Sequence, residues 1–386
     1  MAMAYRIRLT ARCGGPFLLM LLNYLLRSGA YALFRAGWIR AGSRVLEAAL
    51  RRRPDDLAAR RQQAWAFGRL GRPDDVVVEC RRVLESWPHD AESHLGLGIA
   101  LAKLDRHRDA IEAFRDAAEW DLQNPLIFQY LGDSLRATGQ LQDALVAFRR
   151  VVNLRPDSSD ARVDLSAALN ALGHWQESME QTRQAVESGS NRPEAWHNLA
   201  VALTETQKFD EAAVALRKLL TIEPDNRAAK RGLAEMLSRT GSRDEAIAML
   251  DGLTNGRTSD AVSLSILSDL LIDAHRAGEA LHTARTAVAL EPTLALGHAM
   301  LGCALLTHGT QDDALECFEQ ALRLDPDPPE FRAGRGAALA ALHRYAEAMV
   351  DFSAVASTHP DCLDDEVFKP YVDATRAELS EARDRS

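Results

Sequence analysis

Residue patterns that could carry catalysis or hold a cofactor are scarce in this chain. Two glycine pairs, Gly96-Leu-Gly98 and Gly334-Arg-Gly336, match half of a dinucleotide-binding fingerprint. No predicted strand precedes either pair and the third glycine is absent, so the phosphate-binding turn of that fingerprint is not expected. In both pairs the second glycine instead belongs to a repeating column of small residues, described below.

Histidines and cysteines give no site either. The eleven histidines include no HExxH motif. The number of cysteines is odd, and their spacing fits neither a metal site nor a disulfide framework; they are Cys13, Cys80, Cys303, Cys317 and Cys362. No serine, cysteine or carboxylate pair has a partner at a chemically meaningful spacing. The sequence therefore predicts a protein that is not an enzyme and holds no cofactor or metal ion.

The residues that do stand out recur every 34 positions. A column of leucine, with one phenylalanine, consists of Phe67, Leu101, Leu135, Leu169, Leu203, Leu237, Leu271, Leu305 and Leu339. A column of small residues lies three positions earlier, at Ala64, Gly98, Gly132, Ser166, Ala200, Ala234, Ser268, Gly302 and Gly336. A fixed period of this length predicts a solenoid, in which each unit buries its apolar face against its neighbours.

One unit, residues 125–156, shows what each repeat must form. Pro125 begins a helix whose apolar residues recur at spacings of three and four, and Gly139 ends that helix. A second apolar stripe of the same period runs from Leu141 and stops at Pro156. The small residues Gly132 and Ala144 would let the two helices approach closely. The unit is predicted to be an antiparallel helix pair.

These motifs resemble the tetratricopeptide repeat (TPR), whose pattern is W-x2-L-G-x2-Y, then A-x3-F, then P. The matching residues are Phe128-x2-Leu131-Gly132-x2-Leu135, Ala144-x3-Phe148 and Pro156. The resemblance implies an all-α, right-handed superhelical solenoid. It further implies nine units over residues 57–362, a degenerate first unit over 23–56, and a C-terminal capping helix over 363–386. The end units carry Gln63 and Arg335 where the others have leucine, as capping repeats would.

Charge is divided unevenly along the chain. Residues 1–56 carry a net charge of +7, so the remaining residues carry −16 of the total of −9. An acidic solenoid repels phosphate, which argues against nucleic acid as a partner. The basic residues include only five lysines, a bias typical of G- and C-rich bacterial genomes.

The N-terminal segment, residues 1–22, leaves three alternatives open. Arg6, Arg8 and Arg12 precede an apolar run that Arg27 and Ser28 interrupt, too early for a spanning helix. The segment could cap the stack, associate with a membrane surface, or be a signal peptide cleaved after Ala30. Cleavage is the least favoured of the three, because it would cut a helix of the degenerate unit. The expected location is cytoplasmic, with membrane association as an alternative.

The resemblance also indicates where a partner would bind, since the first helix of each TPR unit lines the concave face. The polar residues expected there include Gln129, Tyr130, Asp133, Asn198 and Arg231. In the late units the expected residues are apolar and exceed what the core columns need: Val262, Ile266, Ile272, Leu296, Met300, Cys303 and Leu306. An apolar groove of this kind usually marks a binding site. The lysine and asparagine set with which some TPR proteins grip a terminal carboxylate is absent.

The sequence thus favours a non-enzymatic scaffold that holds a peptide or helix of a partner protein in its concave groove. The alternative is a membrane-peripheral assembly factor that docks through its basic, apolar N-terminus. Self-association is a further open alternative, since the apolar run Phe17–Leu26 could lie in the groove of a second copy.

Overall fold

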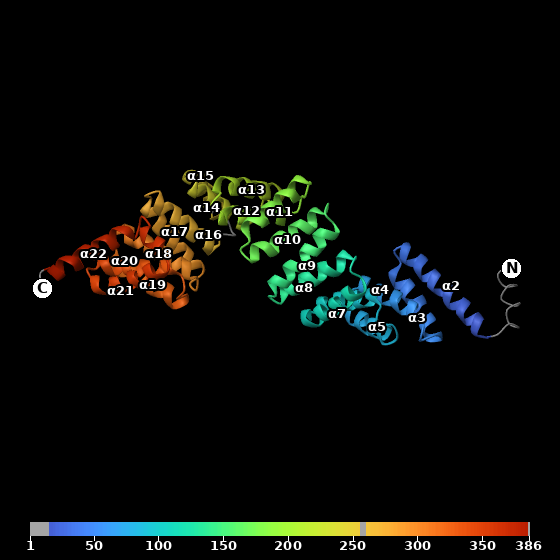
Figure 1. The fold of residues 1–386 in the computed structure, drawn as a ribbon. Coiled ribbons are helices and arrows are strands. Elements are labelled where there is room, and N and C mark those ends of the chain that lie inside the picture. Colours follow the sequence, from blue (N-terminus) through green and yellow to red (C-terminus); the bar gives the residue numbers. More distant parts are fainter. Residues whose placement is uncertain (1–14, 255–259, 385–386) are drawn as a thin grey trace. The chain divides into compact units, whose positions relative to one another are not determined.

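The computed structural model describes residues 15–254 and 260–384, and all the regular structure in these ranges is helical. The predicted all-α fold is therefore confirmed (Figure 1). The first two helices are α2 (Gly15–Arg35) and α3 (Ile39–Arg52). A 3-10 turn, η2 (Pro360–Asp364), and helix α22 (Lys369–Asp384) are the last elements.

Between these ends, eighteen described helices follow one another in pairs. They are α4 (Leu57–Arg69) and α5 (Pro73–Ser86), α6 (Ala91–Lys103) and α7 (His107–Trp120), α8 (Pro125–Ala137) and α9 (Leu141–Leu154), α10 (Ser159–Ala171) and α11 (Trp175–Glu187), α12 (Pro193–Glu205) and α13 (Phe209–Ile222), α14 (Arg227–Arg239) and α15 (Arg243–Thr254), α16 (Ala261–Asp273) and α17 (Ala277–Leu290), α18 (Ala295–His308) and α19 (Gln311–Leu324), and α20 (Pro329–Ala341) and α21 (Tyr345–Thr358).

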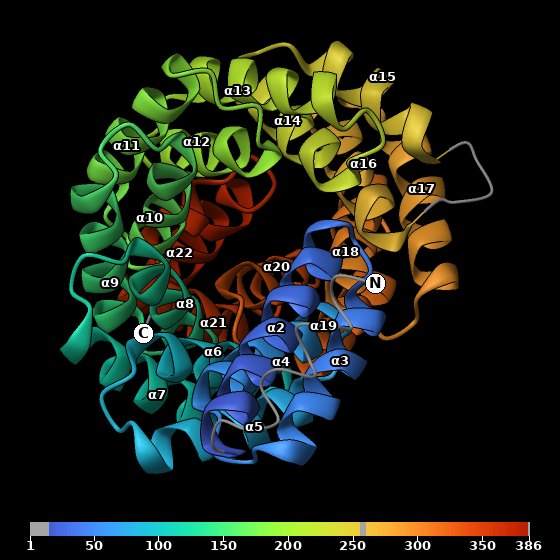
Figure 2. The same ribbon diagram turned by 90° about the vertical axis from the view of Figure 1, so that its right-hand side faces the viewer.

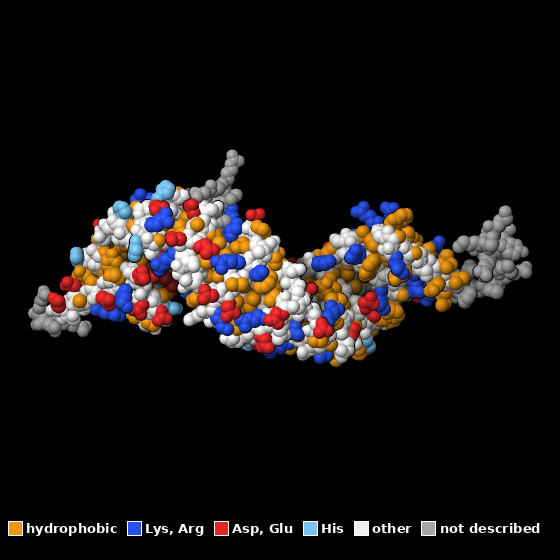
Figure 3. All heavy atoms as spheres, turned by 90° about the horizontal axis from the view of Figure 1, so that it is seen from above, with side chains coloured by type: hydrophobic (Ala, Val, Ile, Leu, Met, Phe, Trp, Pro, Cys, Tyr) orange, Lys and Arg blue, Asp and Glu red, His pale blue; other side chains and the backbone are white. Residues whose placement is uncertain are grey.

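The chain divides into two compact units, Met1–Asn198 and Leu199–Ser386, and the division falls inside α12. Within each unit, the first helices of the pairs lie on the inner side of the curve and the second helices on the outer side (Figure 2). Helices α8 and α10 show this in the first unit, and α14 and α16 in the second. On the face seen in Figure 3, acidic and basic side chains are interspersed over each unit.

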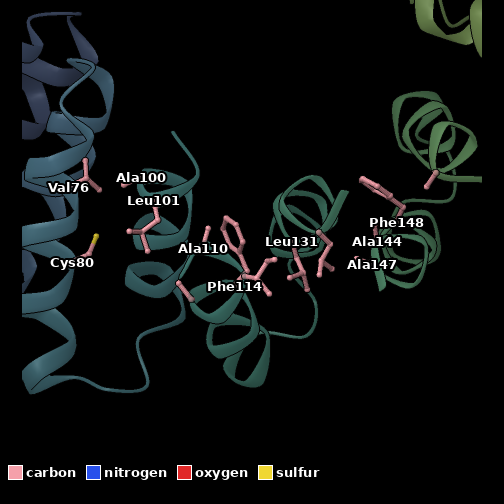
Figure 4. Packing of buried hydrophobic residues seen from close by; sticks show 14 of the residues in the cluster. Val76, Cys80, Ala100, Leu101, Ala110, Phe114, Leu131, Ala144, Ala147 and Phe148 are labelled. Carbon is pink, nitrogen blue, oxygen red and sulfur yellow. The ribbon is translucent and has the colours of Figure 1, made fainter. Parts of the chain in front are cut away.

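The core of each pair depends on a size match between the two helices. In four pairs a glycine of the first helix lies under a phenylalanine of the second, sixteen residues later: Gly98 and Phe114, Gly132 and Phe148, Gly302 and Phe318, and Gly336 and Phe352. A methyl carbon on Gly98 would lie 2.5 Å from the ring of Phe114. Figure 4 shows the two rings of the first unit among the buried residues of its core.

Where the first helix carries a larger residue, the second carries a smaller one. Ala200 and Ala234 precede Leu216 and Leu250 by the same sixteen residues, and all four are buried. Ser268 precedes Ala284, and its hydroxyl donates to the carbonyl oxygen of Ala280 at 3.0 Å. The two columns are therefore complementary in volume in the four glycine–phenylalanine and two alanine–leucine pairs, as close packing requires. The remaining three pairs, among them Ser268 with Ala284, place two small residues there.

The turn between the two helices of each pair has one residue in the left-handed region. Glycine serves at five of these turns: Gly71, Gly139, Gly173, Gly241 and Gly309. At the other four, Asp105, Gln207, His275 and His343 adopt φ values of 58–60°. Glycine adopts this conformation without strain, whereas other L-residues do so at a cost of about 1–2 kcal/mol.

Aspartates at helix starts tie successive first helices together. Asp56, Asp90 and Asp260 each accept from a backbone N–H of the helix that they cap. Each also pairs with an arginine 29 residues earlier, namely Arg27 at 3.1 Å, Arg61 at 3.4 Å and Arg231 at 3.4 Å. A single carboxylate therefore satisfies a helix terminus and links two repeats.

The polar residues of the end units have partners inside the structure, although the buried Oε1 of Gln63 has none. Gln63 is buried and donates from Nε2 to Ser43 Oγ at 2.8 Å. Arg335 donates to both carboxylate oxygens of Asp351, at 2.6 and 2.8 Å. At the C-terminus, α22 begins at Lys369 and buries Val372 and Thr375 while packing on α20 and α21. Residues 1–14 of the N-terminal segment lie outside the described residues, and the predicted domain boundaries stay predictions.

Replacing Gly98 with alanine should lower the melting temperature, although alanine favours a helix by about 1 kcal/mol. The added methyl group must displace the Phe114 ring, and overpacking of this kind costs about 1–3 kcal/mol. Adding Phe114→Leu creates the alanine–leucine match of residues 200 and 216 and should recover stability in a double-mutant cycle. Gly278→Ala, where nothing lies within 4 Å, is the control. Purely additive losses would contradict the size match.

Replacing Gln207 with glycine should stabilise the protein. The strain of a φ of 58° is released, and the larger entropy of glycine in the unfolded chain offsets part of the gain, leaving about 0.5–1 kcal/mol. Gly241→Ala, at the same place in the next unit, should destabilise by a similar amount. Thermal unfolding followed by circular dichroism measures both, and unchanged melting in both variants would show that the turn conformation is not a constraint.

Candidate partner-binding surface

An apolar hollow of the first unit lies on its inner side. It encloses about 410 Å³, and helices α4, α5, α6 and α8 provide its lining. Trp65 is half exposed at its edge, Ile99 and Tyr130 form its wall, and Val76 and Cys80 lie in its floor. Large aromatic side chains that stay half exposed beside an apolar hollow are typical anchors for a partner.

A second hollow, of about 650 Å³, adjoins the first, because Arg61, Trp65 and Glu92 line both. Tyr31 and Phe34 of α2 contribute the aromatic part of its wall. The rings of Phe34 and Trp65 are tilted to one another with centroids 5.1 Å apart. We call the two hollows together the Trp65 groove.

The rim of the Trp65 groove is basic. Arg35, Arg69 and Lys103 are exposed there. Arg61 is held in place by ion pairs with Asp90, at 3.4 Å, and with Glu92. Three exposed cations beside one paired carboxylate leave a surface that attracts negative charge.

Cys80 is not a nucleophile in this groove. Burial, with smaller effects of Asp90 and Glu79, raises the pKa of its thiol to about 12. Because the thiolate is the reactive form, the thiol is inert at neutral pH. It serves as a small apolar residue in the floor of the hollow.

The polar residues predicted for the concave face mostly have partners within the protein. Gln129 donates from Nε2 to Asp164 Oδ2 at 2.8 Å, and Arg192 pairs with the same carboxylate at 3.0 Å. Burial raises the pKa of Asp133, which Arg136 lowers in part and Asp164 raises further. Of Gln129, Tyr130 and Asp133, Tyr130 is the one that lines the Trp65 groove; its ring stacks on Phe114 with centroids 6.0 Å apart.

Asn198 and Arg231 have structural partners. Asn198 is only 7% exposed and donates from Nδ2 to the carbonyl of Val163 at 3.2 Å and to Ser166 Oγ at 3.0 Å. The backbone carbonyl oxygen of Asn198 accepts from Asn170 Nδ2 at 2.9 Å. Asn198 therefore links neighbouring inner helices and is not free for a partner, which corrects the sequence-based expectation. Arg231 is engaged by Asp260, as described above.

The late apolar residues differ among themselves. Val262, Ile266, Leu296 and Met300 are half-buried, whereas Ile272, Cys303 and Leu306 are buried. The expectation that all seven face an open groove is therefore wrong for the last three. Ile272 and Leu306 line a cavity of about 430 Å³ whose opposite wall is Glu366–Tyr371 of the C-terminal segment.

Sequence reasoning missed Trp65. It occupies the ninth position of its unit, the same column as Asp133 and Cys303, which were recognised as concave. A tryptophan at a position that the core does not need is a signal of a contact surface, and the sequence contained it.

His94 and His298 also have a role that the sequence did not indicate. Each ring places Nε2 within 2.8 or 2.9 Å of the carbonyl oxygen of a proline six residues earlier, Pro88 or Pro292. They fix the turn before a first helix and are not directed at a ligand.

The described residues contain neither a metal-binding cluster nor a membrane-spanning helix. No group of three or more histidine, cysteine, aspartate or glutamate side chains is placed to hold a metal ion. None of the described helices combines the length and the apolar character needed to cross a membrane.

Paired helices, complementary small and large columns and an inner groove define a helical-repeat solenoid. Family models described as tetratricopeptide repeat match residues 80–124, 135–203, 203–270 and 299–360, together more than half of the chain. The chain belongs to the tetratricopeptide repeat family, as its motifs predicted. Proteins of this family are typically scaffolds for protein interactions and not enzymes.

Several solved structures are similar to this chain at low identity. The TPR domain of P58(IPK) is 13% identical, with a TM-score of 0.38, and the match covers 93% of this chain and 99% of that one. MamA is 21% identical with a TM-score of 0.40, over 42% and 94%. A TPR protein from Parabacteroides merdae is 13% identical with a TM-score of 0.41, over 74% and 99%. No curated protein sequence matches the chain.

Proposed function

We propose that this protein is a non-enzymatic scaffold that holds a segment of a partner protein in the Trp65 groove. The carrying observation is the half-exposed Trp65 between two adjoining hollows, with aromatic residues of α2 and α8 at either end. The groove walls are helices already packed in the stack, so binding orders the ligand and not the receptor. This preorganisation lowers the entropic cost of association.

The groove chemistry indicates which segment would bind. An apolar or aromatic side chain of the partner would enter the 410 Å³ hollow against Ile99 and Val76. Acidic residues on either side of it would meet Arg35, Arg69 and Lys103 on the rim. Such rim charges mainly accelerate encounter and select partners, while the buried anchor supplies affinity.

Trp65→Ala should weaken partner binding by about 2 kcal/mol or more, roughly 30-fold, because truncation of an anchor leaves its hollow solvated. The measurement is affinity capture from native cells with the full chain as bait, followed by titration of the captured protein. Trp120→Ala, a half-exposed tryptophan at the end of the outer helix α7, is the matched control.

The double variant Ile266→Asp with Met300→Asp completes this test. Both residues are half-buried on inner helices of the second unit, and an aspartate there disfavours an apolar ligand. If this variant loses the partner while Trp65→Ala keeps it, the partner binds in the late repeats and the proposal fails.

A second candidate function is docking on a membrane surface. It is favoured by helix α2, whose polar residues face the protein and whose apolar residues face outward. Asn23 is 2% exposed and Arg27 is paired with Asp56, so polar residues face the protein. Apolar residues face outward, led by Met20, Tyr24 and Leu25, each more than half exposed. Hydrophobic side chains accordingly gather beside the grey N-terminal atoms in Figure 3.

The next helix supplies the charge that an anionic surface requires. Arg40, Arg44 and Arg51 are exposed on α3. An apolar helix face flanked by arginines suits the interface of a membrane that contains anionic lipid. The chain would then present its groove at that surface as a peripheral assembly factor.

The full chain should co-float with phosphatidylserine-containing vesicles and much less with pure phosphatidylcholine vesicles. Leu21→Glu with Leu25→Glu should abolish flotation, because charge on the outward face of α2 opposes insertion. Val146→Glu with Val214→Glu alters two exposed valines on outer helices and should leave flotation unchanged. Flotation that survives the α2 substitutions, or that fails with both vesicles, would contradict this function.

A further inference from the structure

The C-terminal segment lies against the inner side of the late repeats, and we call its residues 363–375 the C-terminal cover. Leu363, Phe368, Val372 and Thr375 are buried as this part of the chain packs on α20 and α21. Figure 1 shows α22 beside α20 at that end of the second unit. The cover thereby reaches past the last repeat to α16 and α18.

Contact between the cover and those two helices is incomplete. A cavity of about 430 Å³ separates Ile272 and Leu306 on one side from Val367, Pro370 and Tyr371 on the other. A gap of this size forfeits much of the dispersion energy that close packing would give. The cover is thus fixed firmly to α20 and α21 and loosely to the surface that it hides.

Like charges face each other at this loose contact. Asp365 and Glu366 of the cover lie near Asp273 of α16, and Asp365 also lies near Asp269 of the same helix. Glu235 of α14 adds a further negative charge. The cations that face the group, Arg243 of α15 and His275 at the end of α16, act on Asp273.

We propose that the inner surface of α16 and α18 is a second protein-docking surface, and that the C-terminal cover is its resident, displaceable occupant. The occupant presents a branched aliphatic and an aromatic residue four positions apart, Val367 and Tyr371, at the start of a helix. A partner segment with the same pair would compete with it. The surplus apolar residues of the late repeats then have a function even though several are buried in the closed arrangement. This proposal is independent of the Trp65 groove.

The opening of the cover should depend on pH. Burial, and then Asp273, Asp365 and Glu235, raise the pKa of Asp269 to about 6. Asp269 lies at an exposed position, and of these causes only Asp365 belongs to the cover, so the closed arrangement favours the protonated carboxyl through the charge of Asp365. The resulting stabilisation of the closed arrangement is complete below the usual aspartate pKa of about 4. It declines as the pH rises through about 6 and is absent above that pH. Raising the pH through about 6 should loosen the cover.

Hydrogen exchange followed by mass spectrometry on the full chain tests this. After correction for intrinsic exchange rates, the amides of residues 366–376 should open up to about tenfold more often at pH 8 than at pH 5, one unit of pKa difference being worth tenfold. Asp365→Asn with Glu366→Gln should slow exchange at pH 8 and flatten the pH dependence. Asp373→Asn, an exposed carboxylate of α22 that does not line the cavity, is the control. If these amides exchange alike at both pH values and in all variants, the segment is a fixed cap and the proposal is overturned.

A second measurement tests the docking surface itself. Val367→Asp with Tyr371→Asp in the full chain should displace the cover, and this variant should bind a fluorescent peptide of wild-type residues 363–384. The wild-type chain should not bind it at pH 5. Adding Leu306→Asp to the open variant should abolish binding while Asp373→Asn should not. Failure of the open variant to bind the peptide would show that the surface under the cover does not act as a docking site.

Discussion

In six of the nine helix pairs, packing depends on the summed volume of one position of the first helix and one position of the second. Glycine with phenylalanine fills that volume in four pairs, and alanine with leucine fills it in two. The two sums are nearly equal, so the axes of these pairs can keep a constant separation, because interiors tolerate neither voids nor overlap. The other three pairs hold two small residues at these positions, as Ser268 and Ala284 do.

The inner side of the stack combines two uses of polar residues. Some hold the repeats together, as Asn198 does through Val163 and Ser166, and as the capping aspartates do through arginines of the preceding unit. Others, such as Arg69 and Lys103, stay exposed beside an apolar hollow. The same helical face is therefore partly structural and partly available, and the available part is concentrated where the aromatic residues lie.

The fold could be predicted from the sequence because the same small and large apolar positions recur in successive units of 34 residues. Leu203 and Leu305 are buried where the leucine column placed them. The site was harder to predict, because facing the groove and being free in it are different properties. Whether Asn198 is exposed depends on a hydrogen bond to another unit, and whether Leu306 is exposed depends on a segment some sixty residues later in the chain. A column assignment carries no information about such distant neighbours.

The residue that completes one pair also touches the next unit. Phe318 lies against Gly334 as well as Gly302, and Phe114 stacks on Tyr130 as well as covering Gly98. Genetic exchange between repeats is therefore restricted in where it can occur. A crossover in the turn between two helices could join the alanine helix of one repeat to the phenylalanine helix of another and create a clash, whereas the reverse product would contain a void. Even a crossover between whole repeats would alter the neighbour that each phenylalanine meets. Packing between neighbouring units therefore constrains their order along the chain, although the units have similar sequences.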